Sequence, residues 1–214
     1  MLSMPYHVLA QRFARLEGLF DVEYRQARQY GHDRIKRWHS LEGLLSTGWQ
    51  TWCGFCREVI VQSCNGTVTM SGVLVPTHAD APTAGRIGYV ARQSLRNQNV
   101  KPVTSLQPHQ EPTWGDPQII IEANDAFKPA NFNSIESGIK LPHLAPEHMR
   151  IVRNAVAHIS AIGMSEVRSI SVYYRGRPFN HPLDFLYWET KDTSESIFLV
   201  WLADLRTMAF QMCQ

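Results

Sequence analysis

The chain has 214 residues, of which 44% are hydrophobic and 19% charged, and its formal net charge is +2. These proportions are near the averages of globular domains, and the length suits one large domain or one domain with an insertion. No window is apolar enough to span a bilayer, and the first residues lack the apolar core of a signal peptide. Four cysteines, three of them in one predicted helix, do not form a secreted disulfide framework. We therefore expect a cytoplasmic protein.

Two long amphipathic helices are predicted first. The first covers about residues 6–30, where apolar residues recur at three- and four-residue steps, and Gly31 is a plausible stop. The second begins after Asp33 as its cap and ends at Asn65-Gly66. Its apolar stripe comprises Trp38, Leu41, Leu45, Trp49, Trp52, Cys56, Val59 and Ile60. Gly48 and Gly54 each weaken a helix by roughly 1 kcal/mol against Ala, unless they allow close helix contact.

An inserted loop region of about residues 67–117 follows. Residues 67–75 are expected to be extended, and residues 86–97 to form a short basic helix. No Asp or Glu occurs from residue 81 to residue 110, whereas Arg86, Arg92 and Arg96 do. Such a local surplus of positive charge can bind RNA phosphates, and the alternative is a solvated helix face.

The C-terminal half is predicted to be helical with one small β-hairpin. Helices are expected over residues 118–127 and 134–141, and another from Pro146 to about Ile159, ending between residues 160 and 163. Residues 167–174 alternate as a strand does and could pair with residues 184–189, which places a hairpin near residues 167–189. Asp192 and Glu195 have the spacing of a capping box for a closing helix that reaches about Met212.

Within the helix after Pro146, the segment Arg153-Asn154-Ala155-Val156-Ala157-His158 holds the residues best suited to chemistry. Asn154 and His158 are four residues apart, which places them on one helical face, and the long side chain of Arg153 can reach the same side. The expected buried stripe is Met149, Val152, Val156 and Ile159, and it contains none of the three. An Arg and a His also stand five apart at Arg34 and His39, so context rather than spacing favours the later pair.

These three residue types suit the cleavage of RNA. RNA carries its own nucleophile, the 2′-hydroxyl, and a histidine can move protons near neutral pH. Arginine can stabilise the charge that develops on phosphorus, and Asn154 can orient the imidazole or bind phosphate. Neither a metal nor a cofactor is required, so we expect neither.

The RNAVAH segment resembles the Arg-polar-x3-His motif of the HEPN superfamily, whose name stands for higher eukaryotes and prokaryotes nucleotide-binding. The early WQTWCGFCREVIVQS helix and the closing helix with Trp201 and Asp204 are also similar to that family. The resemblance implies a mainly α fold, a single HEPN-like bundle of four to six helices over residues 1–214. It also implies a homodimer in which two motif helices form one composite endoribonuclease site, with Arg153 and His158 as the catalytic pair and Asn154 in support.

The resemblance further implies the kind of biology to expect. Many members are toxins or anti-phage effectors, so RNA and an antitoxin or regulatory protein are the expected partners. Other members are non-catalytic modules that bind nucleotides, RNA or proteins, and this is the alternative function. In the family a charged residue on the second helix often supports the cleft, which makes Arg57 and Glu58 candidates. A surface ion pair is an equally good interpretation of them.

A third possibility is thiol-disulfide exchange by Cys53 and Cys56. Trp52-Cys53-Gly54-Phe55-Cys56 resembles the WCGxC motif of thioredoxins, in which a helix N-terminus lowers a thiol pKa. That fold requires a strand directly before the motif, whereas here a helical stripe precedes it. The segment Glu111-Pro112-Thr113-Trp114-Gly115-Asp116-Pro117 has no assignable chemistry, and we expect it to clamp structure, with Trp114 packed on the bundle.

Overall fold

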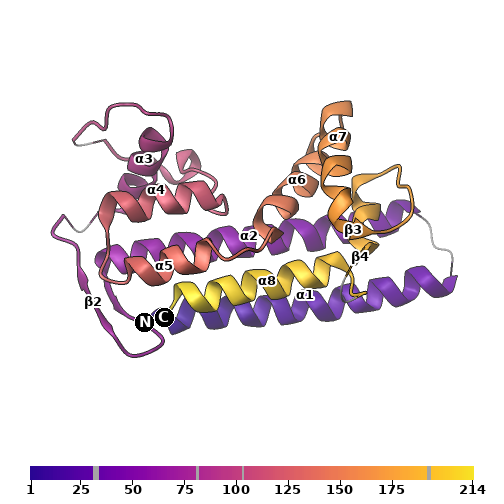
Figure 1. Ribbon diagram of the computed structural model, residues 1–214, viewed down its shortest axis with the longest axis horizontal. Coiled ribbons are helices and arrows are strands. Elements are labelled where there is room, and N and C mark those ends of the chain that lie inside the picture. The colour runs from indigo at the N-terminus through magenta and orange to yellow at the C-terminus, as the bar shows by residue number, and fades with distance from the viewer. Residues whose placement is uncertain (31–33, 81, 103, 192–193) are drawn as a thin grey trace. The chain divides into compact units, whose positions relative to one another are not determined.

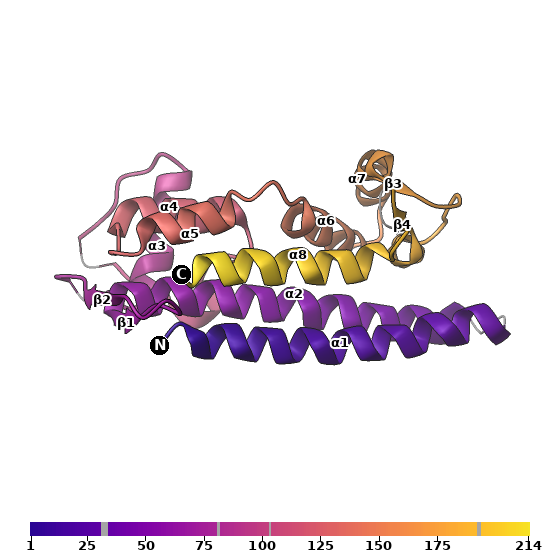
Figure 2. The ribbon, with the colours of Figure 1, turned by 60° about the horizontal axis from the view of Figure 1, so that its bottom comes forward.

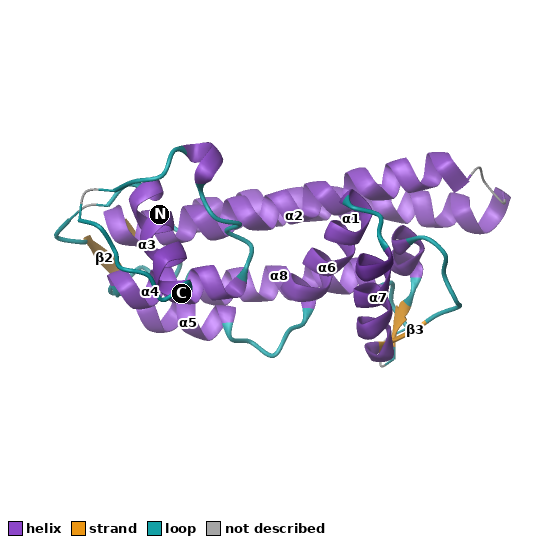
Figure 3. Ribbon diagram, turned by 90° about the horizontal axis from the view of Figure 1, so that it is seen from above, coloured by secondary structure: helices purple, strands orange, loops and turns teal. Residues whose placement is uncertain are grey.

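The computed structural model describes residues 1–30, 34–80, 82–102, 104–191 and 194–214, with the backbone only for residues 27–30 and 34–36. Across these residues the fold is mainly helical, as predicted, and it contains two small antiparallel hairpins where the sequence predicts one (Figure 3). Figure 1 labels the elements, and no described helix is both long and apolar enough to cross a membrane. The predicted stop at Gly31 and the caps at Asp33 and Asp192 lie outside the described residues.

The helices are α1 Ser3–Tyr30, α2 Arg34–Asn65, α3 Ala84–Leu95, α4 Pro117–Phe127, α5 Phe132–Ile139, α6 Ala145–Ala157, α7 Ala161–Ile170 and α8 Ile197–Met212. Short 3-10 turns are η1 Pro108–Gln110, η2 Ser171–Tyr173 and η3 Pro182–Tyr187. One hairpin pairs β1 Gly66–Val68 with β2 Leu74–Thr77, and the other pairs β3 Tyr174–Arg175 with β4 Glu189–Thr190.

The chain divides into two compact units. The first comprises residues 1–10, 51–142 and 206–214, and the second comprises residues 11–50 and 143–205. The long helices α1 and α2 and the closing helix α8 each contribute a segment to both units. The inserted region predicted over residues 67–117 falls wholly within the first unit. The sequence favours one HEPN-like domain, and that assignment stays a prediction.

The apolar stripes of the long helices are confirmed. The apolar residues at these steps in α1 are buried, namely Leu9, Phe13, Leu16 and Phe20. The predicted stripe of α2 is buried apart from half-buried Trp38. In the second unit the segments of α1, α2 and α8 lie alongside one another (Figure 2), with the Phe20 and Phe198 rings 5.0 Å apart between centroids. Gly48 allows the close contact that the sequence suggests, because a Cβ there would lie 3.0 Å from Cε of Met149.

In the first unit, the β1–β2 hairpin is bonded to both ends of the chain. Leu2 donates its backbone N–H to Val68, and Met70 donates to the carbonyl of Cys213. The segment predicted as one extended piece over residues 67–75 is therefore a hairpin with a turn at its centre. The remaining helices of this unit, α3, α4 and α5, begin and end within two residues of their predicted limits.

The predicted strand over residues 167–174 is wrong. Residues 161–170 form α7, with Ser160 as its cap: the Ser160 hydroxyl accepts from the N–H of Gly163. The buried positions Gly163, Val167 and Ile170 recur at helical rather than alternating steps. Only Tyr174 and Arg175 are extended, so the hairpin near residues 167–189 exists in a much shorter form. The closing helix α8 begins at Ile197, two residues after Glu195.

Two helical glycines should respond in opposite ways to substitution by alanine. Gly54 in α2 is exposed, and a Cβ there would have no atom within 4 Å, so Gly54→Ala should raise the free energy of unfolding by about 0.5–1 kcal/mol. At Gly138 in α5 a Cβ would lie 2.7 Å from the backbone nitrogen of Met212. Gly138→Ala should therefore lower the unfolding free energy by roughly 1–3 kcal/mol. Urea titration measures both, and equal stabilities would contradict this packing of α5 on α8.

Candidate functional site

The RNAVAH segment lies at the C-terminal end of α6, in the second unit. Pro146 and Glu147 are in the first turn, as predicted. The buried side of α6 comprises His148, Met149, Val152 and Ala155. The predicted stripe is therefore only half right: Met149 and Val152 are buried, Val156 is half-buried, and Ile159 is 69% exposed.

His158 is not on the helix, which corrects the predicted shared face with Asn154. α6 ends at Ala157, and His158 is its cap residue with φ −135° and ψ 73°. The backbone N–H of His158 still donates to the Asn154 carbonyl, the last bond of the helical series. Helical periodicity therefore does not set the direction of the imidazole, which lies exposed in the turn before Ser160.

The turn after His158 is short because α7 packs closely on α6. A Cβ at Gly163 would lie 3.3 Å from the Cβ of Ala155, so only small residues permit this approach. The small side chain of Ala155 thus admits α7 as its neighbour. α6 and α7 thus form a corner that presents the motif at its apex.

Arg153 and Asn154 are half-buried and contact each other. Nη1 of Arg153 donates to Oδ1 of Asn154 over 3.2 Å. Among the described residues, Arg153 has no carboxylate partner within 4.0 Å. A guanidinium without a carboxylate keeps its charge available for a phosphate. The structure thus gives Asn154 a definite contact, with Arg153 rather than with the imidazole.

The buried side of α6 carries a polar network that the sequence analysis did not single out. His148 is 3% exposed, and its Nδ1 lies 2.6 Å from the hydroxyl of Tyr174. The same hydroxyl accepts a 2.9 Å bond from Nε1 of Trp201 on α8. An indole N–H can only donate, so Tyr174 is the acceptor in the bond from Trp201. The tautomer of His148 sets which of the two groups donates in the bond between Nδ1 and the Tyr174 hydroxyl. Burial lowers the pKa of His148 to about 4 and raises that of Tyr174 to about 12.

This network fixes α6 to β3 and α8 and does not join the motif. Its histidine is held neutral and is almost fully buried, as suits a structural hydrogen bond rather than proton exchange with solvent. The sequence contains a signal for this network, because His148 is four residues before Val152 and therefore on the apolar side of the helix.

Asp204, also on α8, contacts Nδ1 of His143 at 3.1 Å, and burial raises the pKa of Asp204.

The supporting candidates Arg57 and Glu58 belong to the first unit. Arg57 holds Glu111 with two bonds of 2.7 and 3.1 Å, and also contacts Glu58 at 3.2 Å. Trp114 Nε1 donates to the same Glu111 carboxylate, and the bonds from Arg57 and, less strongly, from Trp114 lower the pKa of Glu111. Trp114 is 4% exposed. The loop of residues 111–117 is thus clamped as the sequence suggests, and Arg57 acts in that clamp.

The arginines of α3 bind backbone in this structure. Arg86 donates to the carbonyls of Lys101 and Thr104, and Arg92 donates to that of Gln110. Arg96 is the exposed C-cap of α3. Two of the three arginines predicted to contact RNA thus bind the loop that follows α3. RNA binding by this region stays a prediction.

The thiol alternative finds little support. None of the four cysteines forms a disulfide, and Cys53 and Cys56 lie in the interior of α2 rather than at a helix N-terminus. Burial raises the pKa of the Cys56 thiol well above its usual value, which is opposite to the change that a redox cysteine needs. Among the described residues, no three His, Cys, Asp or Glu side chains are grouped as metal ligands.

The neutral state of His148 makes stability depend on pH. The unfolded chain protonates this histidine near pH 6.5, whereas the folded chain does so only near pH 4. The unfolded state thus binds more protons in that range, and stability falls as the pH falls through it, by roughly 3 kcal/mol. Urea titrations at pH 7 and pH 4 should show a smaller loss for His148→Gln than for the wild type. His158→Gln, at an exposed position, is the matched control and should behave as the wild type does; an identical loss in all three chains would refute the assignment.

The motif corner at the end of α6 thus combines an available cation with an exposed imidazole. Comparison of the chain with protein-family models, curated proteins and solved structures finds no match.

Proposed function

We propose that the protein is a metal-independent endoribonuclease of the HEPN type, with His158 and Arg153 as its catalytic residues. The observation that carries the proposal is the corner of α6 and α7. There, a guanidinium held by Asn154 and unpaired with any described carboxylate stands five residues before an exposed histidine. These side chains indicate cleavage of a phosphodiester, because arginine binds phosphate oxygens and histidine transfers protons near neutral pH.

The reaction needs a base and an acid at once. A neutral imidazole takes the proton of the 2′-hydroxyl, and the 2′-oxygen then forms a bond to phosphorus. The bond from phosphorus to the 5′-oxygen breaks, and a protonated imidazole gives that oxygen its proton. The products are a 2′,3′-cyclic phosphate and a 5′-hydroxyl, with no other reactant. Arg153 would stabilise the negative charge on the phosphorus centre.

One chain offers one histidine at this corner, so the second proton carrier has to come from elsewhere. We infer a second copy of the chain, which would supply a second His158 and a second Arg153. The surface beside the motif supports this: Ile159 is 69% exposed and Ile162 is 74% exposed, on either side of the Ser160 turn. Large apolar side chains grouped on a surface are typical of interfaces between proteins.

A non-catalytic HEPN-like module is the second candidate. Across the described residues, no hydrogen bond to the His158 imidazole orients it. An unoriented imidazole suits a binding module as well as half of a composite enzyme site. Toxin or anti-phage activity, and control by an antitoxin, remain proposals that follow from the ribonuclease assignment.

Cleavage of labelled single-stranded RNA in the presence of a chelator tests the assignment. His158→Ala should lower the rate by about 10²–10⁴-fold, because general acid–base catalysis contributes that much. Arg153→Ala should lower it as well, and a substrate with 2′-deoxyribose at the cleaved position should be inert. His39→Ala is the matched control, since His39 is also exposed and also follows an arginine by five residues. Undiminished cleavage by His158→Ala, with intact melting behaviour, would exclude the proposal.

The composite site has its own test. Ile162→Glu places a charge on the exposed turn without disturbing the buried side of α7. It should shift the mass measured by light scattering from two copies to one and reduce cleavage by a similar factor to His158→Ala. Ile162→Ala, which removes apolar surface without adding charge, should have an intermediate effect. A wild-type chain that cleaves RNA as a single copy would overturn the two-copy arrangement while leaving the catalytic residues in place.

A further inference from the structure

The second unit also contains a cavity of about 950 Å³, on the side of α6 that carries the β3–β4 hairpin. The loop of residues 176–180 forms one wall, and the other walls come from α1, α2, η3 and β4. The loop lies against the indole of Trp188, because a Cβ at Gly176 would be only 2.1 Å from that ring. The volume is within the usual range of small-molecule sites, roughly 300–1,000 Å³.

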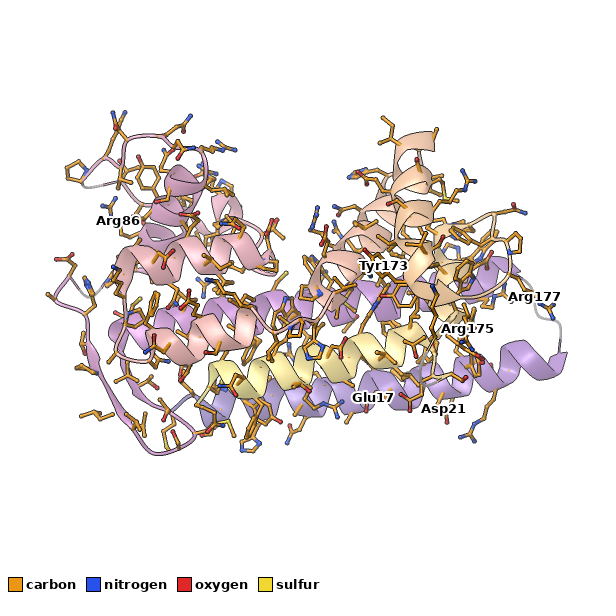
Figure 4. The ribbon with its side chains drawn as sticks, in the orientation of Figure 1. Glu17, Asp21, Arg86, Tyr173, Arg175 and Arg177 are labelled. Carbon is orange, nitrogen blue, oxygen red and sulfur yellow. The ribbon has the colours of Figure 1, made fainter. Side chains whose placement is uncertain are left out.

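The cavity has more positive than negative charge available. Three arginines line it against two carboxylates. Arg37 is paired with Asp184 at 3.1 Å, and Trp38 donates to the same oxygen, so this carboxylate is already engaged. Arg175 and Arg177 are exposed (Figure 4). Among the described residues, neither has a carboxylate within 4.0 Å. Arg175 lies opposite Glu189 in the register of β3 and β4.

Aromatic rings supply most of the remaining lining. Tyr24, Trp38, Phe179, Tyr187 and Trp188 are all half-buried, so each ring keeps part of its surface toward the cavity. Planar rings of this kind stack on nucleobases, and single-strand binding sites combine them with arginines that hold the phosphate. A phosphate alone would need the arginines but not the rings.

Two polar atoms of the lining residues are buried without a hydrogen-bond partner in the described structure. They are Nε of Arg37 and the hydroxyl oxygen of Tyr187. Both can donate, and buried donors are normally paired in folded proteins. Acceptor atoms on a bound molecule could take hydrogen bonds from both donors after a small side-chain movement.

We propose that this cavity binds a nucleotide, with its phosphate at Arg175 and Arg177 and its base among the aromatic rings. The site requires neither His158 nor a second copy, so it goes beyond the ribonuclease proposal and can hold where that proposal fails. A free nucleoside monophosphate and one nucleotide of an RNA strand offer the same base and phosphate. The ligand in the cavity could therefore be a free nucleotide or one nucleotide of an RNA strand.

The test uses the full chain carrying His158→Ala, so that RNA is not cut. Calorimetric titration with AMP, GMP, CMP and UMP should show saturable binding of at least one of them. Ribose 5-phosphate and the matching nucleoside should bind at least about tenfold more weakly, because each lacks one half of the ligand. A six-nucleotide RNA distinguishes the sources: tighter binding than the monophosphate indicates a strand site, and equal or weaker binding indicates a free nucleotide.

The matched variants carry equal charge changes. Arg175→Ala with Arg177→Ala should weaken binding by about tenfold or more, since each charge-assisted contact contributes at least a factor of about ten. Arg12→Ala with Arg168→Ala removes two exposed arginines of the same unit that do not line the cavity, and should change affinity less than about twofold. Equal weakening in both pairs, absence of binding by every nucleotide and the RNA, or equally tight binding of ribose 5-phosphate would each overturn the proposal. Melting curves of both pairs confirm that the comparison is between folded chains.

Discussion

The hydroxyl of Tyr174 is the point on which the second unit depends. It accepts a hydrogen bond from Trp201 of α8 and shares a second one with Nδ1 of His148 of α6, so three segments far apart in sequence meet at one atom. The bonds are 2.6 and 2.9 Å long and part-buried, and replacement of Tyr174 would remove this partner from both His148 and Trp201. Because α6 ends in the motif and Tyr174 begins the arginine-bearing hairpin, both proposed sites are positioned by this contact.

The position of the motif follows from the side of α6 that is already occupied. His148, Met149, Val152 and Ala155 face inward, and Gly163 brings α7 against Ala155. The helix α6 ends at Ala157, just before the turn that leads into α7. Arg153, Asn154 and His158 are not among the buried residues of α6. A catalytic group at a helix end is held by fewer backbone bonds than one in a helix interior, so its final orientation is open to a second molecule.

The sequence predicts the long helices well because each carries a stripe of large apolar residues over many turns. It fails at residues 167–174, where β-branched and aromatic side chains suggest a strand over too few residues for periodicity to decide. Arg153 and Asn154 were placed on α6 correctly, whereas the cap geometry of His158 depends on how α7 packs. The cavity at Arg175 could not be predicted, because its walls come from four segments brought together only by folding. The run Tyr-Tyr-Arg-Gly-Arg was its only local signal.

The two proposed sites differ in what they can do alone. The cavity has its cations and aromatic rings within one chain, so a single copy can hold its ligand. The motif has one imidazole, and a neutral imidazole cannot accept one proton and supply another to the leaving oxygen in the same step. Water could replace one of the two, but water at neutral pH is a far weaker acid than an imidazolium ion. The proposed composite site would supply the missing imidazole, and the exposed isoleucines beside His158 are where we expect the second copy to bind.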